Sequence, residues 1–247
     1  MANEPTYERL ALLGLTAMAL AWKEQDKSAE YAAMPFDDRL GLLVDSEWIA
    51  RENKRMKRRL SEAKLKMSNA SIETIDYPAT RKMDKSFIRQ LSSCRWVAEH
   101  QNVVVTGKTG TGKTFVACAL AHQACLRGFR TIYRRATRLF EELTLAHADG
   151  TYIRLLQKLA RVDVLVIDGW GLAAPRDVDR RDLLEILEDR YGHRSTLMTS
   201  QIPPESWHDQ LGDPTLADAI CDRVLHNAHR LVLQGPSRRK EAAPAQS

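Results

Sequence analysis

The segment "GKTGTGKT", from Gly107 to Thr114, decides the fold of this chain. It carries glycine, lysine and threonine at every fixed position of the pattern G-x-x-x-x-G-K-[ST]. The apolar run "NVVV" precedes it and the apolar segment "FVACALAHQACL" follows it, so it lies between a predicted strand and a predicted helix. Glycines let the backbone curl until several N–H groups point inward, and the helix adds the positive end of its dipole. This context predicts a loop that binds phosphate groups.

Two side chains of this loop have separate predicted roles. Lys113 is expected to reach the β- and γ-phosphates of a nucleotide, and the hydroxyl of Thr114 is expected to ligate Mg²⁺. The remaining predicted nucleotide contacts are Gly107, Lys108, Thr109, Gly110, Thr111 and Gly112. ATP and Mg²⁺ are therefore the predicted ligands.

Apolar, β-branched runs alternate with helical stretches on both sides of the loop. The runs are, in chain order, "NVVVTG", "RTIYRR", "VDVLVID", "STLMTS" and "HRLVL". Helical patterns separate them at 113–127, 136–160 and 178–191, and further helices reach about residue 226. Such alternation is typical of a parallel sheet with helices on both faces. The predicted fold class is therefore α/β, a P-loop NTPase sheet with flanking helices.

The region before this sheet has a different pattern. Residues 1–67 show helical periodicity without a strand-like run, which predicts a small all-helical domain. Residues 68–83 mix turn formers with few periodic apolar positions and are interpreted as a linker. The second domain is expected over residues 84–247.

Asp168 ends the buried run "VLVID", and Gly169 follows it. In a parallel sheet this position places the carboxylate at the edge where ligands bind, so Asp168 is the second predicted Mg²⁺ ligand. The alternative is an aspartate that caps the next turn. Gly169 has no side chain, and the nearest later acids, Asp177 and Asp179, lie beyond a loop whose path the sequence does not define. We expect ATP hydrolysis to be slow if no other group positions the attacking water.

Four further residues are candidates for contact with the γ-phosphate. Ser200 and Gln201 end the stretch "LMTSQ" and are expected to orient water or sense the phosphate; a solvated strand end is the alternative. Arg223 and Arg239 are candidates for a positive charge at the γ-phosphate, Arg223 from a neighbouring subunit. Each is otherwise a surface arginine.

The segment from Arg51 to Lys66 holds eight basic residues and two acids. On a helix, its basic residues gather on one arc: Arg51, Lys54, Arg55, Arg58, Arg59 and Lys66. Such a face can neutralise phosphates of a nucleic-acid backbone without selecting bases. A solvated helix face is the alternative.

Composition excludes several classes of protein. The 247 residues, 44% hydrophobic and 28% charged, are typical of a globular protein, and the net charge is +5. The four cysteines show no metal-ligand spacing, which favours a reducing cytoplasm. The longest uncharged stretch, from Leu10 to Trp22, is too short to span a membrane.

Taken together, these motifs resemble the IstB-type ATP-binding proteins of bacterial insertion sequences, relatives of the DnaC helicase loaders within the AAA+ ATPases. The resemblance covers nearly the whole chain. The segments that carry it are the phosphate loop, "DRLGLLVDSEWIARENKRMKRRLSEAKL", "RLFEEL", "DGTYIRLLQKLARVDVLVID", "RRDLLEILEDRYGHRSTLMTSQ" and "WHDQLGDPTLADAICDRVLHNAHRLVL".

The resemblance implies an ATPase that assists a DDE transposase. Such a protein assembles with ATP as a homo-oligomer on double-stranded DNA, remodels it and presents it as target. In this family the loop at 107–114 would bind ATP and Asp168 would serve the metal. The Ser200–Gln201 region would be sensor one. Arg223 would be the inter-subunit finger and Arg239 sensor two. Relatives usually carry an acid directly after the metal-binding aspartate, where this chain has Gly169.

Two other classes of function are alternatives for these motifs. A replicative helicase loader would bind a helicase rather than a transposase. A P-loop kinase would act as a monomer on a small substrate, but the basic segment and the lack of an evident lid argue against it.

Overall fold

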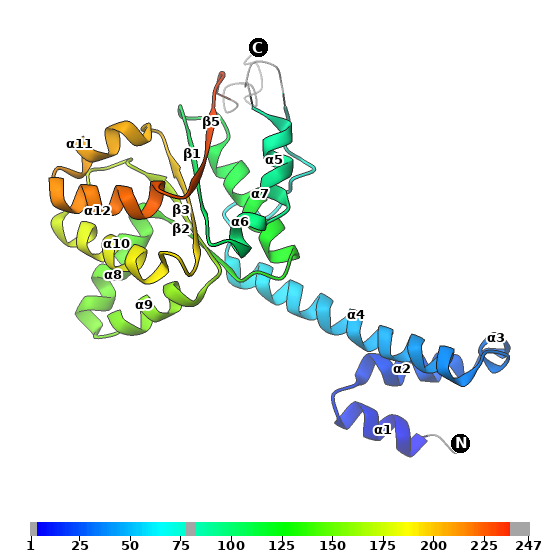
Figure 1. Ribbon diagram of the computed structural model, residues 1–247. Helices are drawn as coiled ribbons and strands as arrows, with labels where there is room; N and C mark the ends of the chain where they lie inside the picture. The colour runs from blue at the N-terminus through cyan, green and yellow to red at the C-terminus, as the bar shows by residue number, and fades with distance from the viewer. Residues whose placement is uncertain (1–3, 78–82, 238–247) are drawn as a thin grey trace, which may run out of the picture. The chain divides into compact units, whose positions relative to one another are not determined.

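The computed structural model describes residues 4–77 and 83–237, and the chain divides into two compact units, Met1–Arg58 and Arg59–Ser247 (Figure 1). The boundary lies nearer the N-terminus than residue 67, where the sequence pattern places the end of the helical domain. Residues after Arg58 belong to the second unit because their apolar side chains pack there. Ala63 is fully buried, and Leu65 and Met67 contact the core of the sheet.

The first unit is helical, as expected. Its helices are α1 (Glu4–Leu12), α2 (Thr16–Gln25), α3 (Ala29–Ala32) and most of α4 (Phe36–Ala63). Tyr7 packs edge-on against Trp22, with the ring centroids 4.9 Å apart. The carboxylate of Glu47 accepts hydrogen bonds from the N–H groups of Ala17 and Met18, at 2.9 and 3.1 Å. Glu47 thereby satisfies two of the N–H groups that a helix start leaves without an intrahelical partner.

Helix α4 ends earlier than the sequence pattern predicts. The pattern continues to residue 67, but the helix stops at Ala63 and Lys64 adopts a positive φ of 50°. Lys66 therefore does not lie on the helix that carries the other basic residues. The expectation of one continuous basic arc to Lys66 is wrong for this last residue.

The segment interpreted as a linker contributes to the core. In its described part, Ala70, Ile75 and Met83 are at most 9% exposed and belong to the cluster around the sheet. These apolar residues show no helix or strand period, but burial stabilises them in any backbone conformation. Residues 68–77 are therefore part of the packed second unit.

The second unit is built on the predicted parallel sheet. Its strands are β1 (Asn102–Gly107), β2 (Thr131–Arg135), β3 (Val164–Trp170), β4 (Ser195–Ser200) and β5 (Ala228–Leu233). Their order is β2-β3-β4-β1-β5, and every neighbouring pair is parallel. Apolar runs become strands here because both faces of the sheet are covered.

Helices cover the two faces of this sheet (Figure 1). On one face lie α5 (Lys85–Ser92), α6 (Arg95–Ala98) and α7 (Lys113–Leu126). On the other lie α8 (Ala136–Asp149), α9 (Tyr152–Arg161), α10 (Asp177–Arg190), η2 (Pro204–Ser206), α11 (Trp207–Leu211) and α12 (Pro214–Leu225). The helix predicted over 136–160 is divided at Gly150, whose φ of 73° ends α8. None of the helices in the described residues is long and apolar enough to cross a membrane.

The strand register brings separate parts of the sequence together at one edge. Thr106, at the end of β1, pairs with Ser200 at the end of β4, and Arg135 pairs with Asp168. Ligands of open α/β sheets bind at this carboxyl edge. The phosphate loop, Asp168 and the end of β4 are therefore neighbours.

Candidate nucleotide-binding site

The phosphate loop has a backbone that only glycine permits at two points. Gly107 and Gly110 have φ values of 146° and 85°. A Cβ atom at Gly107 would collide with the carbonyl oxygen of Leu233, and one at Gly110 would collide with Ser237. The loop can thus curl closely under the start of α7, which supplies the positive end of a helix dipole. These residues fit a bound phosphate chain.

Lys113 is the first residue of α7 and is only 9% exposed. Its Nζ atom donates hydrogen bonds to the carbonyl oxygens of Gly107 and Lys108, at 2.6 and 2.9 Å. The ammonium group therefore lies inside the curl of the loop, where the phosphate oxygens of a nucleotide would be strong acceptors for it.

Asp168 accepts hydrogen bonds from three hydroxyl groups. Thr114 Oγ1 lies 2.9 Å from Oδ1, Tyr133 Oη lies 2.7 Å from Oδ2, and Thr199 Oγ1 lies 2.6 Å from Oδ1. Burial, together with the hydrogen bond to Asp168, raises the pKa of Tyr133 above its ordinary value, so the phenol remains a donor. Among the described residues, these bonds join Asp168 to side chains rather than to the following turn. The Thr114 and Asp168 oxygens are hard donors of the kind that suits Mg²⁺.

Tyr133 and Thr199 were not predicted from the sequence. Tyr133 lies on β2, beside β3, and nothing local marks it as a partner of Asp168. The period-2 alternation of side chains along a strand could have identified Thr199. If Gln201 faces the site at the end of a strand, Thr199 faces it too and Ser200 faces away.

The end of β4 follows that alternation. Gln201 Oε1 accepts a hydrogen bond of 2.6 Å from Thr109 Oγ1, which links it to the phosphate loop. Ser200 is fully buried; its hydroxyl donates to the carbonyl of Trp170 and accepts from the N–H of Ile202, both at 3.0 Å. The structure thus brings Gln201 to the phosphate loop, whereas Ser200 contacts the backbone of Trp170 and Ile202.

Gly169 lies at an irregularity in the pairing of β3 with β4, with a φ of 79°. Its N–H donates to Thr199 Oγ1 at 2.8 Å, so Thr199 joins this backbone to Asp168. A Cβ atom added here would lie 2.8 Å from Cδ1 of Leu172. The glycine that replaces an expected acid is therefore also the residue type that this backbone favours.

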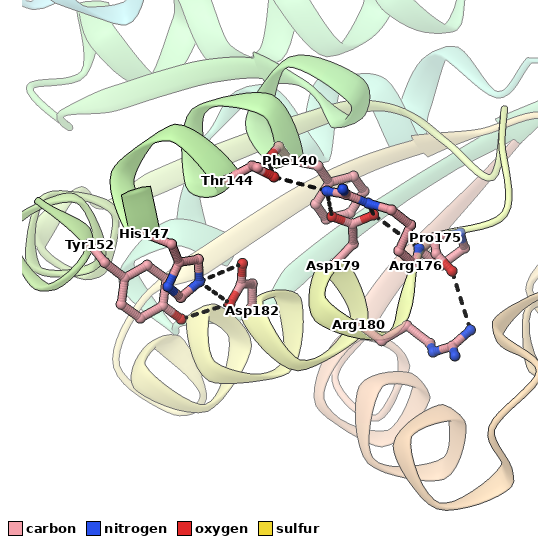
Figure 2. A network of polar contacts seen from close by, with 9 residues as sticks. All are labelled: Phe140, Thr144, His147, Tyr152, Pro175, Arg176, Asp179, Arg180 and Asp182. Atoms are coloured by element: carbon pink, nitrogen blue, oxygen red, sulfur yellow. Dashed lines mark hydrogen bonds and ion pairs between the residues drawn. The ribbon is translucent and has the colours of Figure 1, made fainter. Parts of the chain in front are cut away.

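Asp177 and Asp179, the acids that follow Gly169 in the sequence, are paired with arginines away from the phosphate loop. Figure 2 shows Asp179 paired with Arg176, whose guanidinium also donates to Thr144 Oγ1 at 2.8 Å. Burial tends to raise the pKa of Asp179, but hydrogen bonds from Arg176 outweigh this and hold the pKa below its ordinary value. Asp177 is paired with Arg180. Neither acid lines the cavity at the phosphate loop.

This cavity has a volume of about 410 Å³. Its lining residues are Lys66, Met67, Thr109, Gly110, Gly112, Lys113, Thr114, Phe115, Arg135, Asp168, Gly169, Leu172, Thr199 and Gln201. Asp168 is the only acid among these described residues. Lys66, which is predicted to contact DNA, lines the phosphate-loop cavity, because the chain leaves the helical path after Ala63.

Arg223 is not brought to this site within its own chain. Arg223 forms ion pairs with Glu188 and Asp222, at 3.1 and 2.7 Å, and its guanidinium carbon lies 4.6 Å from the ring centroid of Tyr191. Its carbonyl oxygen accepts from Asn102, at the start of β1, whereas the phosphate loop follows the end of this strand. Arg239 lies outside the described residues.

The predicted basic face is divided between the two units. Arg51, Lys54, Arg55 and Arg58 are exposed on α4 in the first unit. Arg51 and Arg55 pair with Glu47 and Glu52, at 2.7 and 2.5 Å. Arg59 belongs to the second unit, where its Nε donates to the carbonyl of Cys125 at 3.0 Å.

Comparisons with known proteins agree with this geometry. IstB-like ATP binding proteins match residues 8–245. An insertion sequence ATP-binding protein from Sinorhizobium fredii is 43% identical over 240 residues, covering 97% of this chain and 98% of the relative. The ATP-binding protein of insertion sequence IS1162 from Pseudomonas fluorescens is 46% identical over 203 residues, covering 82% and 88%.

Solved structures with a similar fold include a helicase loader and DnaI. The crystal structure of the DnaC helicase loader has a TM-score of 0.59 at 21% identity, covering 67% of this chain and 97% of that one. The crystal structure of DnaI has a TM-score of 0.60 at 23% identity, covering 74% and 100%. At these identities the likeness concerns the fold alone. The sequence relatives carry the family assignment: this chain is an ATP-binding protein of the IstB-like family of insertion sequences, with a P-loop AAA+ fold.

Proposed function

We propose that this chain is an ATP-dependent DNA-binding regulator of transposition. It binds Mg·ATP, assembles as a homo-oligomer on duplex DNA, remodels that DNA and recruits or stimulates a partner DDE transposase. The observation that carries the ATP-dependent part is the arrangement of Lys113, Thr114 and Asp168 at a glycine-lined loop. Membership of a family of insertion sequence proteins supports the role in transposition.

In this proposal the chain holds ATP through groups with separate tasks. The loop N–H groups and Lys113 bind the β- and γ-phosphates, and the oxygens of Thr114 and Asp168 hold Mg²⁺. The metal neutralises charge that develops on the phosphates. Tyr133 and Thr199 keep the Asp168 carboxylate oriented when the Thr114 hydroxyl turns to the metal. Gln201, linked to the loop through Thr109, is placed to orient water beside the γ-phosphate.

Slow hydrolysis is part of the proposal. A general base near the γ-phosphate is typically worth about 10² to 10⁴ in rate. Asp168 is committed to the metal, Gly169 has no side chain, and Asp177 and Asp179 are paired with arginines. We expect the ATP-bound assembly to persist because its turnover lacks this assistance. Another subunit would supply Arg223 as a positive charge, and Arg239 would act as sensor two, in the roles that the family resemblance implies.

The exposed basic face of α4 is the proposed DNA contact. Arg51, Lys54, Arg55 and Arg58 present positive charge on one helix. Contacts to backbone phosphates give affinity that depends strongly on salt and weakly on base sequence. A helicase loader has the same fold, so the partner has to be identified by binding rather than by architecture.

The test is assembly on duplex DNA with a non-hydrolysable ATP analogue, followed by electron microscopy and analytical ultracentrifugation. The unsubstituted protein is expected to form large complexes only when nucleotide and DNA are both present. Lys113→Ala should lose them, whereas Lys85→Ala, on the surface of α5, should retain them. Assembly of Lys113→Ala with ATP would contradict the nucleotide site. Binding of a replicative helicase in place of the transposase would contradict the role in transposition.

A further inference from the structure

A second cavity lies at the opposite edge of the sheet from the phosphate loop. It has a volume of about 500 Å³, and its walls include Thr131, the first residue of β2, and Val162, two residues before β3. Among the residues that the structure describes, six basic side chains line it: Arg59, Lys64, Arg130, Arg154, Lys158 and Arg161. Glu62 is the one acid among these described lining residues. The cavity is thus strongly positive and distinct from the nucleotide site.

Helix α9 presents a basic stripe to this cavity. Arg154, Lys158 and Arg161 are spaced by four and three residues, so they share one face, and all three are exposed. Leu156 and Leu159 are buried against the sheet. With a rise of 1.5 Å per residue the stripe is about 10 Å long, the axial length of about three nucleotides of one strand.

Two of the remaining cations, Arg130 and Arg59, are held in place by hydrogen bonds to backbone carbonyls. Arg130 donates to the carbonyl of Arg161 at 2.8 Å, and its Nε lies 3.9 Å from Asp163. Arg59 donates to the carbonyl of Cys125. Asp163 and Glu62 offset part of the charge, but most of it remains. Like charges gathered this closely repel one another unless a polyanion neutralises them.

We propose that this basic cavity, with the α9 stripe, binds backbone phosphates of duplex DNA. It is a second contact, additional to the exposed face of α4, and it rests on the proposed function that the chain assembles on DNA. An open, exposed stripe that matches several consecutive phosphates fits a nucleic-acid backbone better than a single free anion. Contact at this surface adds salt-dependent affinity without selecting bases.

The test substitutes the three basic residues of the α9 stripe in the full chain. Arg154→Gln, Lys158→Gln and Arg161→Gln are combined, and a matched control combines Lys85→Gln, Arg89→Gln and Arg95→Gln, three exposed cations on α5 and α6. Affinity for two duplexes of unrelated sequence is measured against salt with a non-hydrolysable ATP analogue. We expect the stripe variant to lower the slope of log affinity against log salt by about 1 to 3, at about 0.9 per lost contact. The control should retain the slope of the unsubstituted protein.

The outcomes separate this inference from the proposed function. Failure of the unsubstituted protein to bind DNA overturns the proposed function. DNA binding by the stripe variant equal to that of the control overturns only the second contact. If a second equivalent of ATP binds the unsubstituted protein, competes with DNA and is lost in the stripe variant, the cavity holds a free nucleotide and the inference is wrong.

A measurement on the unsubstituted protein covers the case in which the stripe variant fails to fold. Acetylation of Lys64, Lys158 and Lys85 is followed by mass spectrometry with the ATP analogue alone and with the analogue plus duplex DNA. Addition of DNA should slow the modification of Lys64 and Lys158 several-fold and leave Lys85 unchanged. Equal modification of Lys158 with and without DNA overturns the inference.

Discussion

Replacement of Gly169 by aspartate tests whether the missing carboxylate limits ATP hydrolysis. A non-glycine residue with a φ near 79° costs about 1–2 kcal/mol, and aspartate tolerates this region better than most residues. The added Cβ would lie 2.8 Å from Leu172 Cδ1, but this side chain is 50% exposed and can turn aside. The expected loss of about 1–2 kcal/mol would lower the melting temperature by about 2–8 °C.

The expected gain in rate is larger than this cost. Leu172 lines the phosphate-loop cavity, so a side chain at position 169 that points toward Leu172 enters the cavity. A carboxylate there can act as general base, worth about 10² to 10⁴ in rate. Gly169→Asp should therefore hydrolyse Mg·ATP faster in single-turnover assays and shorten the lifetime of the ATP-bound DNA complex.

Gly169→Asn is the matched control, because asparagine has the size of aspartate and tolerates positive φ but is not a base. Both variants should melt at similar temperatures, and only Gly169→Asp should turn over faster. Equal rates in the two variants would refute the reasoning. If the unsubstituted protein already matches Gly169→Asp, then Gln201 or a neighbouring subunit positions the water.

Two further substitutions test the hydrogen bonds of Thr199 and Ser200, and an acid titration tests the role of Glu47. Thr199→Val leaves the Gly169 N–H without its acceptor and Asp168 without one of its three hydroxyl donors, so we expect a loss of about 1–3 kcal/mol in denaturant unfolding. The affinity for Mg·ATP should fall more than the affinity for ATP without metal. Ser200→Ala, next to it, removes hydrogen bonds to the backbone of Trp170 and Ile202 but none to Asp168, so it should leave this metal dependence unchanged; equal effects of both would refute the assignment of Thr199. The hydrogen bond from Arg51 holds the pKa of Glu47 below its ordinary 4.5, so its stabilising contribution is present above pH 4.5 and lost as pH falls through the lowered pKa. Circular dichroism in acid should show a larger loss of stability for the unsubstituted chain than for Glu47→Gln, and parallel curves would contradict this role.

The phosphate loop and the five strands could be predicted because their signals are local. Gly107, Gly112, Lys113 and Thr114 are contiguous or nearly so, and the loop chemistry depends on their own backbone. The strands are apolar runs because both faces of a parallel sheet are buried. In these elements the residues that form the sequence pattern are also the residues that determine the local structure.

The partners of Asp168 could not be predicted in the same way. Tyr133 lies 35 residues from Asp168 and Thr199 lies 31 residues away, and only the pairing of β2 and β4 with β3 brings them together. The position of Lys66 depended on where α4 ends, since one break in the helix moved this side chain from the basic arc to the phosphate-loop cavity.

The sequence by itself therefore determined the α/β class, the phosphate loop and Asp168 at the carboxyl edge of the sheet, because each depends on neighbouring residues and on apolar periodicity. The tertiary structure alone decided that Tyr133 on β2 donates to Asp168 and that α9 joins Arg59 and Lys64 in one basic cavity. These relations join residues far apart in the chain, and strand register and helix packing set them. No local pattern encodes the direction in which such side chains meet.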